Sequence, residues 1–197
     1  MDNSWKTAFT VLALLVSVRG AAALDCRSLR PQYEGKQFVL QHNLRVVDNE
    51  ASWVNFVIAG NFVPVGTAVT IEKVGRQTVR VSVPSLNRRV SMDLEDGQPT
   101  CDAILGRVLG ATAPSLAQLS ELDREGIRRG EILVGMTRGA VFMAVGYPPY
   151  YYAPPFLGDR KNALNHDPSA QKLTYVGSTW DFIPVSFAAD VVAAVGD

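Results

Sequence analysis

Between residues 33 and 95, apolar and polar residues alternate in short stretches that are separated by turn residues. In residues 79–83 three valines alternate with Arg80 and Ser82, and residues 90–94 follow the same pattern. A period of two is typical of strands that bury one face. Further β-rich stretches lie at 36–40, 53–58 and 69–71. Because about five short strands bury a core most economically by curling on themselves, we expect a small SH3-like β-barrel over residues 24–101.

The period of the pattern changes after residue 115. Apolar residues recur at helical spacing over residues 116–128, which predicts an amphipathic helix. Ser115 is the expected N-cap, and Gly130 is expected to end the helix. The intervening residues 102–114 mix Gly, Pro and Ala. We interpret them as a linker between two domains.

A second, shorter helix is specified at both ends. Thr137 is a good N-cap, Gly146 suits a helix end, and Pro148 with Pro149 prevents continuation. Three β-rich stretches follow at 172–176, 181–187 and 191–195, and Pro184 among them is expected at an edge or a bulge. The chain is thus predicted to be α+β, with two helices and a three-stranded antiparallel sheet over residues 115–197.

The N-terminus carries the features of a secretory signal peptide. Lys6 precedes an apolar run at 11–18, and residues 21–23 match an A-x-A cleavage site. The run is shorter than the roughly 20 apolar residues that span a bilayer, and no later stretch approaches that length. The alternative is a buried N-terminal helix. We expect residues 1–23 to be removed on export, leaving no transmembrane segment in the mature chain.

The charge of the mature chain excludes one class of partner. Cleavage removes Lys6, Arg19 and Asp2 from totals of 19 basic and 19 acidic residues, which leaves nearly equal numbers. A chain without a basic excess has no general attraction to nucleic acid. We therefore expect no nucleic-acid partner.

The two cysteines, Cys26 and Cys101, survive cleavage. An even count in an exported chain favours a disulfide, and this one would clasp the two ends of the predicted barrel. Two unrelated thiols are an alternative. Lipid attachment to Cys26 is a further one, although the charged Asp25 stands where a lipoprotein signal has a small residue.

The C-terminal half resembles the SmpA/OmlA (BamE-like) family of small bacterial envelope proteins. The residues that carry the resemblance are Gly135, Met136, Thr137, Val141, Gly146, Pro148 and Tyr175. The resemblance covers about residues 115–197 and implies two helices packed on a three-stranded sheet. It also implies a non-enzymatic accessory role in outer-membrane assembly, with contacts to protein partners, outer-membrane components or lipid.

Catalytic and metal-binding motifs are scarce. The two histidines, His42 and His166, stand apart, and no sequence typical of a zinc hydrolase, a serine hydrolase or a dithiol oxidoreductase occurs. We interpret His42 as a partly exposed strand residue. His166 beside Asp167 falls short of the three or four ligands that a metal needs. We predict no catalytic residues, no metal and no cofactor.

The strongest candidates for a binding surface are aromatic. Tyr147, Tyr150, Tyr151 and Tyr152 fall within six residues and are flanked by prolines. Tyrosine offers a large apolar area with a polar tip, which suits contact surfaces. The alternative is packing between the helices, the sheet and the adjoining domain. Trp180 is a further candidate, for which burial in the core is the alternative.

These observations favour a non-enzymatic binding protein of the cell envelope. We expect it in the periplasm or at the periplasmic face of the outer membrane, with envelope proteins as partners. One alternative is an envelope hydrolase or peptidoglycan-acting enzyme whose site the sequence does not reveal. Another is a structural component of a secreted assembly.

Overall fold

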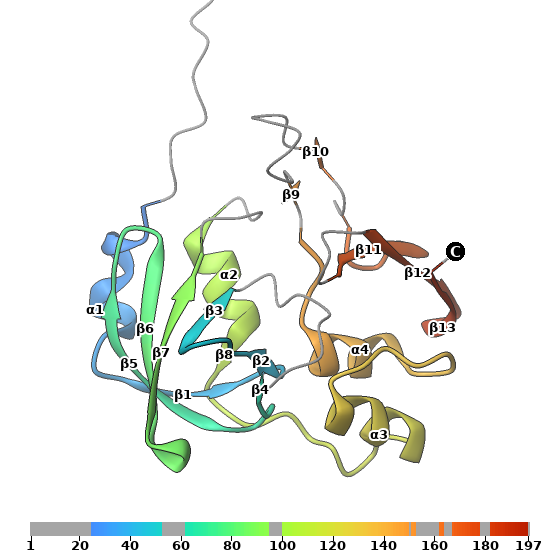
Figure 1. Ribbon diagram of the computed structural model, residues 1–197, viewed down its shortest axis with the longest axis horizontal. Helices are drawn as coiled ribbons and strands as arrows, with labels where there is room; N and C mark the ends of the chain where they lie inside the picture. The colour runs from blue at the N-terminus through green and yellow to red at the C-terminus, as the bar shows by residue number, and fades with distance from the viewer. Residues whose placement is uncertain are drawn as a thin grey trace, which may run out of the picture.

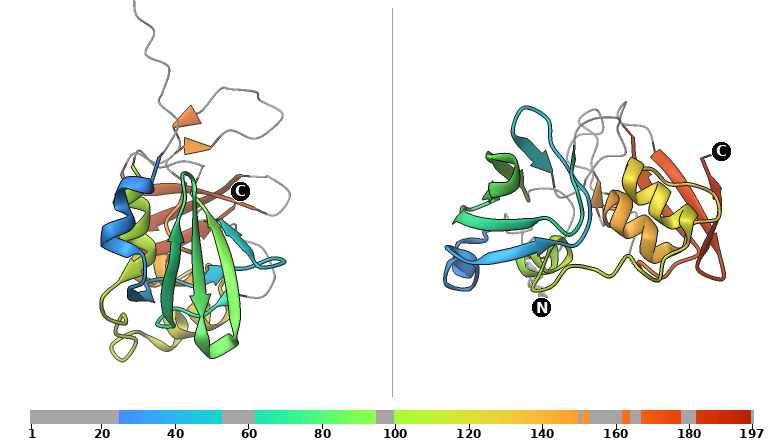
Figure 2. Two further views of the ribbon diagram at one scale, coloured as in Figure 1. Left: turned by 90° about the vertical axis from the view of Figure 1, so that its left-hand side faces the viewer. Right: turned by 90° about the horizontal axis from the view of Figure 1, so that it is seen from below.

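The structure is a computed structural model that describes residues 25–52, 62–94, 100–149, 151–152, 162–163, 167–177 and 182–196. The predicted strand at 53–58 lies outside them. Two units lie side by side, one built on a large sheet and the other on two helices and a small sheet (Figure 1; right-hand view of Figure 2). Each unit has its own cluster of buried apolar side chains. The protein therefore belongs to the predicted α+β class.

The N-terminal unit contains an open sheet. In the part of the chain that the structure describes, β3 and β8 are the edges of this sheet, so the predicted closed SH3-like barrel is not formed. Among the described strands, only β3 and β7 pair in parallel. The strand order is β3-β7-β6-β5-β1-β8, with β1 (Gln37–Leu40), β3 (Glu50–Ser52), β5 (Ala68–Val74), β6 (Thr78–Val83), β7 (Arg88–Asp93) and β8 (Leu109–Gly110); a separate pair is β2 (Leu44–Arg45) with β4 (Phe62–Val63).

Helices cover the apolar face of this sheet in place of barrel closure. The main one is α2 (Cys101–Val108), whose Ile104, Leu105 and Val108 are buried in the core of the unit. The predicted linker at 102–114 therefore contains a helix and strand β8, because Thr100 caps α2 and its apolar residues recur at helical spacing. The short η1 (Arg27–Leu29) and α1 (Arg30–Tyr33) add Leu29 and Tyr33 to the same core.

The C-terminal unit packs two helices and three strands around one core. Its elements are α3 (Glu121–Arg129), α4 (Arg138–Val145), β11 (Lys172–Val176), β12 (Phe182–Ala188) and β13 (Val191–Val195), and the sheet is antiparallel in the order β11-β12-β13. The bounds predicted for α4 are confirmed: the Thr137 hydroxyl caps its first turn, and Gly146 follows it with a φ of 78°. Strand β9 (Tyr151–Tyr152) pairs with β10 (Asn162–Ala163).

Helix α3 begins later than the sequence pattern predicted. Its N-cap is Ser120 rather than Ser115, because the Asp123 carboxylate accepts from the Ser120 N–H while the Ser120 hydroxyl accepts from the Asp123 N–H. Asp123 is buried and also accepts from the Thr137 N–H at 2.7 Å. One carboxylate thus ties the start of α3 to the start of α4.

Pro184 lies in the central strand β12, although an edge or a bulge was expected. Its carbonyl accepts from the Gly196 N–H at 2.8 Å, just beyond the end of β13. In an antiparallel sheet the N and C=O of one residue point toward the same neighbouring strand. The nitrogen of Pro184 therefore points toward β13 where the β12–β13 ladder ends, and no N–H donor is required there.

The two units meet at Asn43, which is 1% exposed. Its side-chain amide donates to the Ile127 carbonyl at 2.6 Å and to the Ala144 carbonyl at 3.1 Å, in the last turns of α3 and α4. Its backbone N–H donates to the Met143 carbonyl at 2.9 Å, and its side-chain oxygen accepts from the Val65 N–H at 2.9 Å. One loop residue therefore donates to carbonyls in the last turns of both helices, although the Ile127 carbonyl also accepts from the Gly130 N–H at 3.1 Å.

Arg45 strengthens the same junction. Its guanidinium donates to the Gly130 carbonyl at 2.6 Å, just past the end of α3, and lies 5.1 Å from the centre of the Phe62 ring. A cation is stabilised at this position by the partial negative charge of the helix C-terminus. A side chain on Gly130 would collide with Arg45, so the close approach also requires glycine there.

Replacing Asn43 tests the importance of the junction. Asn43→Ala removes both side-chain donors from buried carbonyls, and we expect the free energy of unfolding to fall by about 3 kcal/mol. Asn43→Asp keeps the size but places a carboxylate against the same carbonyls, and it should destabilise more. Urea unfolding followed by circular dichroism measures both. An Asp variant as stable as the wild type would contradict the described role.

Candidate functional site

The central strands β5, β6 and β7 bury one face and expose the other. Strict alternation from the buried Ile71 would turn Lys73 inward. A bulge in β5 between these two residues instead leaves Glu72 and Lys73 both exposed. The outward residues that result include Glu72, Lys73, Thr78, Arg80, Ser82, Arg89, Ser91 and Asp93.

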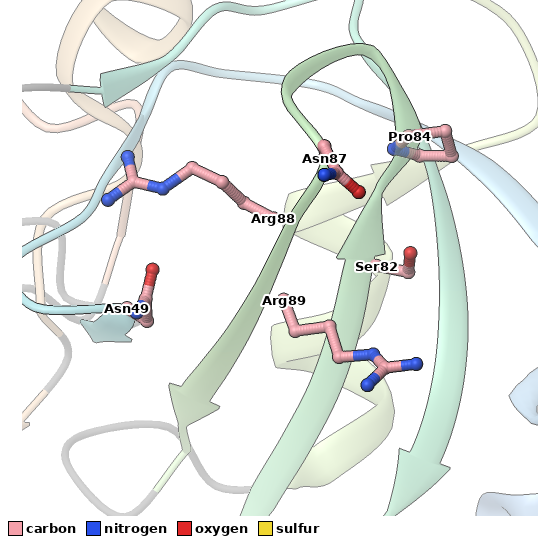
Figure 3. A pocket seen from close by; sticks show the side chains of 6 residues that line it. All are labelled: Asn49, Ser82, Pro84, Asn87, Arg88 and Arg89. Carbon is pink, nitrogen blue, oxygen red and sulfur yellow. The ribbon is translucent and has the colours of Figure 1, made fainter.

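A hollow of about 470 Å³ lies at the end of the β6–β7 hairpin. Arg89 extends across β6 toward β5, whereas Arg88 extends toward the side where Asn49 lies (Figure 3). The turn between the strands, η2 (Pro84–Leu86), ends at Asn87, whose φ of 47° reverses the chain. The lining is Asn49, Ser82, Pro84, Asn87, Arg88 and Arg89.

A second hollow, of about 190 Å³, lies further along the same strands. The pairing register sets Lys73 of β5 opposite Arg80 of β6, and Arg80 opposite Ser91 of β7. Gly75 and Thr78 complete its lining. We call the outward surface with Lys73, Arg80 and Arg89, together with Arg88 at its edge, the basic face.

The basic face is only partly neutralised. Arg89 forms an ion pair with Glu72 at 2.9 Å. Lys73, Arg80 and Arg88 form no ion pair with any residue that the structure describes. Lys73 and Arg80 face each other as like charges across two strands, and such a pair destabilises a sheet. The excess of positive charge makes this surface suited to an anionic group.

The chemistry of the basic face is that of binding. Guanidinium, ammonium, hydroxyl and amide groups offer hydrogen bonds and charge to a ligand. The residues that line the two hollows include no histidine or cysteine. Within the described ranges, no cluster of three or more His, Cys, Asp or Glu side chains could hold a metal ion.

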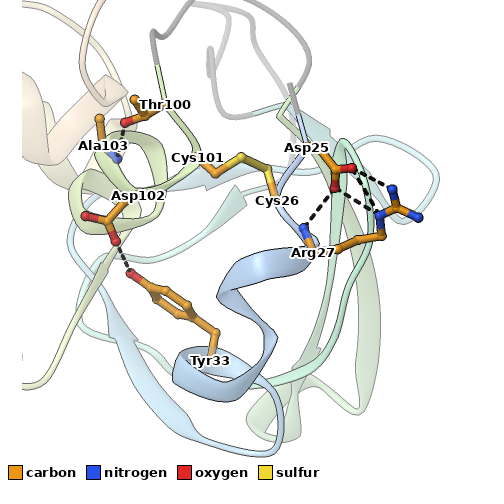
Figure 4. Close-up of a disulfide and its surroundings, with 8 residues drawn as sticks. All are labelled: Asp25, Cys26, Arg27, Tyr33, Thr100, Cys101, Asp102 and Ala103. Atoms are coloured by element: carbon orange, nitrogen blue, oxygen red, sulfur yellow. Dashed lines mark hydrogen bonds and ion pairs between the residues drawn. A yellow bond between two sulfur atoms is a disulfide. The ribbon is translucent and has the colours of Figure 1, made fainter. Parts of the chain in front are cut away.

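The predicted disulfide is present between Cys26 and Cys101, whose Cα atoms are 5.4 Å apart. It links the residue before η1 to the start of α2, and the Tyr33 hydroxyl donates to Asp102 at 3.4 Å across the same gap (Figure 4). The bond is present as predicted, but it does not join the two ends of the N-terminal unit, because α2 and β8 follow Cys101. The alternatives of free thiols and of lipid on Cys26 do not apply to this structure, because both sulfur atoms are bonded to each other.

Tyr147 is the one predicted aromatic contact whose surroundings the structure describes. Its ring stacks on Phe142 of α4 at 4.3 Å, and the Arg107 guanidinium of α2 lies 4.8 Å from its centre. It thus contacts elements of both units, as the packing interpretation holds. Tyr151 and Tyr152 form β9, whereas Tyr150 and Trp180 lie outside the described residues. The docking role of these residues stays a prediction.

His42 is buried, with 2% of its surface exposed, and not partly exposed as predicted. It lies in the bend before Asn43, and its Nδ1–H donates to the Asn43 carbonyl at 2.7 Å. Burial lowers the pKa of the imidazole, which the hydrogen bond opposes more weakly. A neutral histidine therefore belongs to the junction between the units. His166 lies outside the described residues.

The basic face was not among the predicted sites, although part of it is visible in the sequence. Alternation over residues 79–83 already turns Arg80 outward, and the turn at 84–87 pairs β6 with β7 and brings Arg89 beside Ser82. Lys73 gives no such indication, because only the bulge turns it outward. Lys73, Arg80 and Arg89 lie near one another because of the pairing register of β5, β6 and β7.

Comparison of the chain with known protein families, with curated proteins and with solved structures finds no match in any of the three. The resemblance to the SmpA/OmlA family therefore stays a prediction. In the described ranges, no helix has the length and apolar character needed to cross a membrane.

Removing the disulfide should destabilise the protein. The bond joins residues 75 positions apart, and in the chain-entropy model its loss from Cys26→Ala/Cys101→Ala costs about 4 kcal/mol. Urea unfolding of the variant and of the oxidised wild type measures the difference. Mass spectrometry with and without reductant checks the bond. Equal stability of the two proteins would contradict the role of the disulfide.

Stability should fall in mild acid because of His42. The folded state holds the imidazole below its ordinary pKa of 6.5, so the unfolded chain takes up a proton first. The free energy of unfolding should fall as pH drops below about 6.5, with a slope approaching about 1.4 kcal/mol per pH unit. His42→Asn should flatten this slope. A wild-type stability independent of pH from 7 to 5 would contradict the assignment.

Proposed function

We propose that this chain is an exported, non-enzymatic binding protein of the cell envelope that holds its partner on the basic face. The observation that carries the proposal is the grouping of Lys73, Arg80 and Arg89 around two hollows on the exposed side of the large sheet. Concave surfaces with convergent polar groups are where proteins most often bind ligands.

Two further features support an envelope location. The N-terminal residues read as an export signal, and the Cys26–Cys101 bond suits an oxidising compartment such as the periplasm. The described order of two helices and a three-stranded antiparallel meander also fits the BamE-like arrangement that we propose for residues 115–197. That family resemblance favours a protein partner at the periplasmic face of the outer membrane.

Charge removal on the basic face tests the proposal. Arg80→Gln/Arg89→Gln should lose the envelope partner in chemical cross-linking and affinity capture with the mature, disulfide-bonded protein. The matched control is Arg124→Gln/Arg128→Gln on α3, which removes the same charge from two exposed arginines that pair with glutamates of their own helix. The control should capture the partner as the wild type does.

The variants need one further measurement. Both double variants should keep the wild-type circular dichroism, because all four arginines are exposed, and neither should melt at a lower temperature by more than a few degrees. If both capture the same protein equally well, the basic face is not the binding surface. If neither captures it, the binding depends on general charge and the proposal fails.

A further inference from the structure

We propose that the ligand of the basic face is an acidic protein segment in extended conformation, with carboxylates at alternate residues. This inference rests on the proposed function and names the chemistry of the partner. One carboxylate of the segment would lie between Lys73 and Arg80, and the next would reach Arg89.

The first carboxylate position follows from the pairing of like charges. Lys73 and Arg80 are directly opposite each other on neighbouring strands, and neither forms an ion pair among the residues with described placement. An anion placed between them removes their repulsion and gains a charge-assisted hydrogen bond from each. The pair is therefore more favourable with an anionic ligand than without one.

The second position follows from Arg89. Its guanidinium already binds the Glu72 carboxylate at 2.9 Å, which shows that this surface accommodates a carboxylate. The Arg89 side chain is still 77% exposed. Because a guanidinium offers five N–H donors in a planar fork, a second carboxylate can bind its open edge.

The spacing between these positions favours an extended peptide. Arg80 pairs with Ser91, whereas Arg89 pairs with Ser82, so the backbone positions of the two arginines lie in rows two residues apart. Two residues along a strand span about 7 Å, which is also the repeat of same-side side chains in an extended peptide. The hydroxyls of Ser82 and Ser91 lie in the same rows and can bind the peptide backbone.

Other anionic partners fit the surface less well. The lining of the two hollows includes no aromatic ring on which a sugar could stack. A membrane surface would need a group of apolar side chains to insert, and near the larger hollow the exposed large apolar side chains among the described residues are Leu86, 44% exposed, and Val47, 60% exposed. A hollow also suits a narrow chain better than a flat bilayer.

Fluorescence anisotropy with labelled peptides tests the inference on the mature, disulfide-bonded protein. The probes are a peptide that alternates Glu and Ser, a peptide of the same composition with its Glu residues in one block, and a Gln-for-Glu version. The alternating peptide should bind about tenfold more tightly than the block peptide, and the Gln peptide should not bind. Lys73→Gln and Arg80→Gln should each weaken binding about tenfold, whereas the control Arg124→Gln should not.

Two competing ligands complete the test: vesicles containing phosphatidylglycerol, and an oligomer of uronic acids. The inference is overturned if the alternating and block peptides bind equally, if Arg80→Gln has no effect on binding, or if either competitor binds in preference to the peptide. In each of these cases the proposed function still stands provided that Arg80→Gln/Arg89→Gln abolishes partner capture. The inference and the proposed function both fail only if partner capture is also unaffected by Arg80→Gln/Arg89→Gln.

Discussion

The arrangement of the two units depends on the buried amide of Asn43. Helices α3 and α4 end near Asn43, which forms buried hydrogen bonds with the carbonyls of Ile127 and Ala144. Asn43 donates to one carbonyl of each helix, and Arg45 donates to the carbonyl of Gly130 just past α3. A buried carbonyl without a donor is costly, so these bonds favour a single relative placement of the two units.

Among the described residues, the large sheet is covered on one face. Helix α2 packs on this apolar face, the disulfide links the residue before η1 to the start of α2, and the described side chains of the opposite face are largely exposed. The basic face is therefore displayed on a covered sheet and not on a loop. A rigid sheet reduces the conformational entropy that the binding site loses when the ligand binds.

Charge has different roles on the two sides of the molecule. At the junction Arg45 is compensated by a helix end, and on α3 the arginines Arg124 and Arg128 pair with glutamates of the same helix. On the basic face Lys73 and Arg80 are set against each other. Two like charges opposite each other destabilise a sheet. The presence of this pair therefore distinguishes the basic face from an ordinary solvent-exposed surface.

The local pattern of the sequence determined α4, whose two ends carry their own capping residues, the three C-terminal strands, and the pairing of the cysteines. It also determined the outward direction of Arg80, because the period of two extends over a whole strand. Tertiary structure alone decided the open sheet with α2 across it, the burial of His42, the role of Asn43 and the outward turn of Lys73. Each of these depends on partners far away in the chain or on a bulge, which a local pattern does not encode.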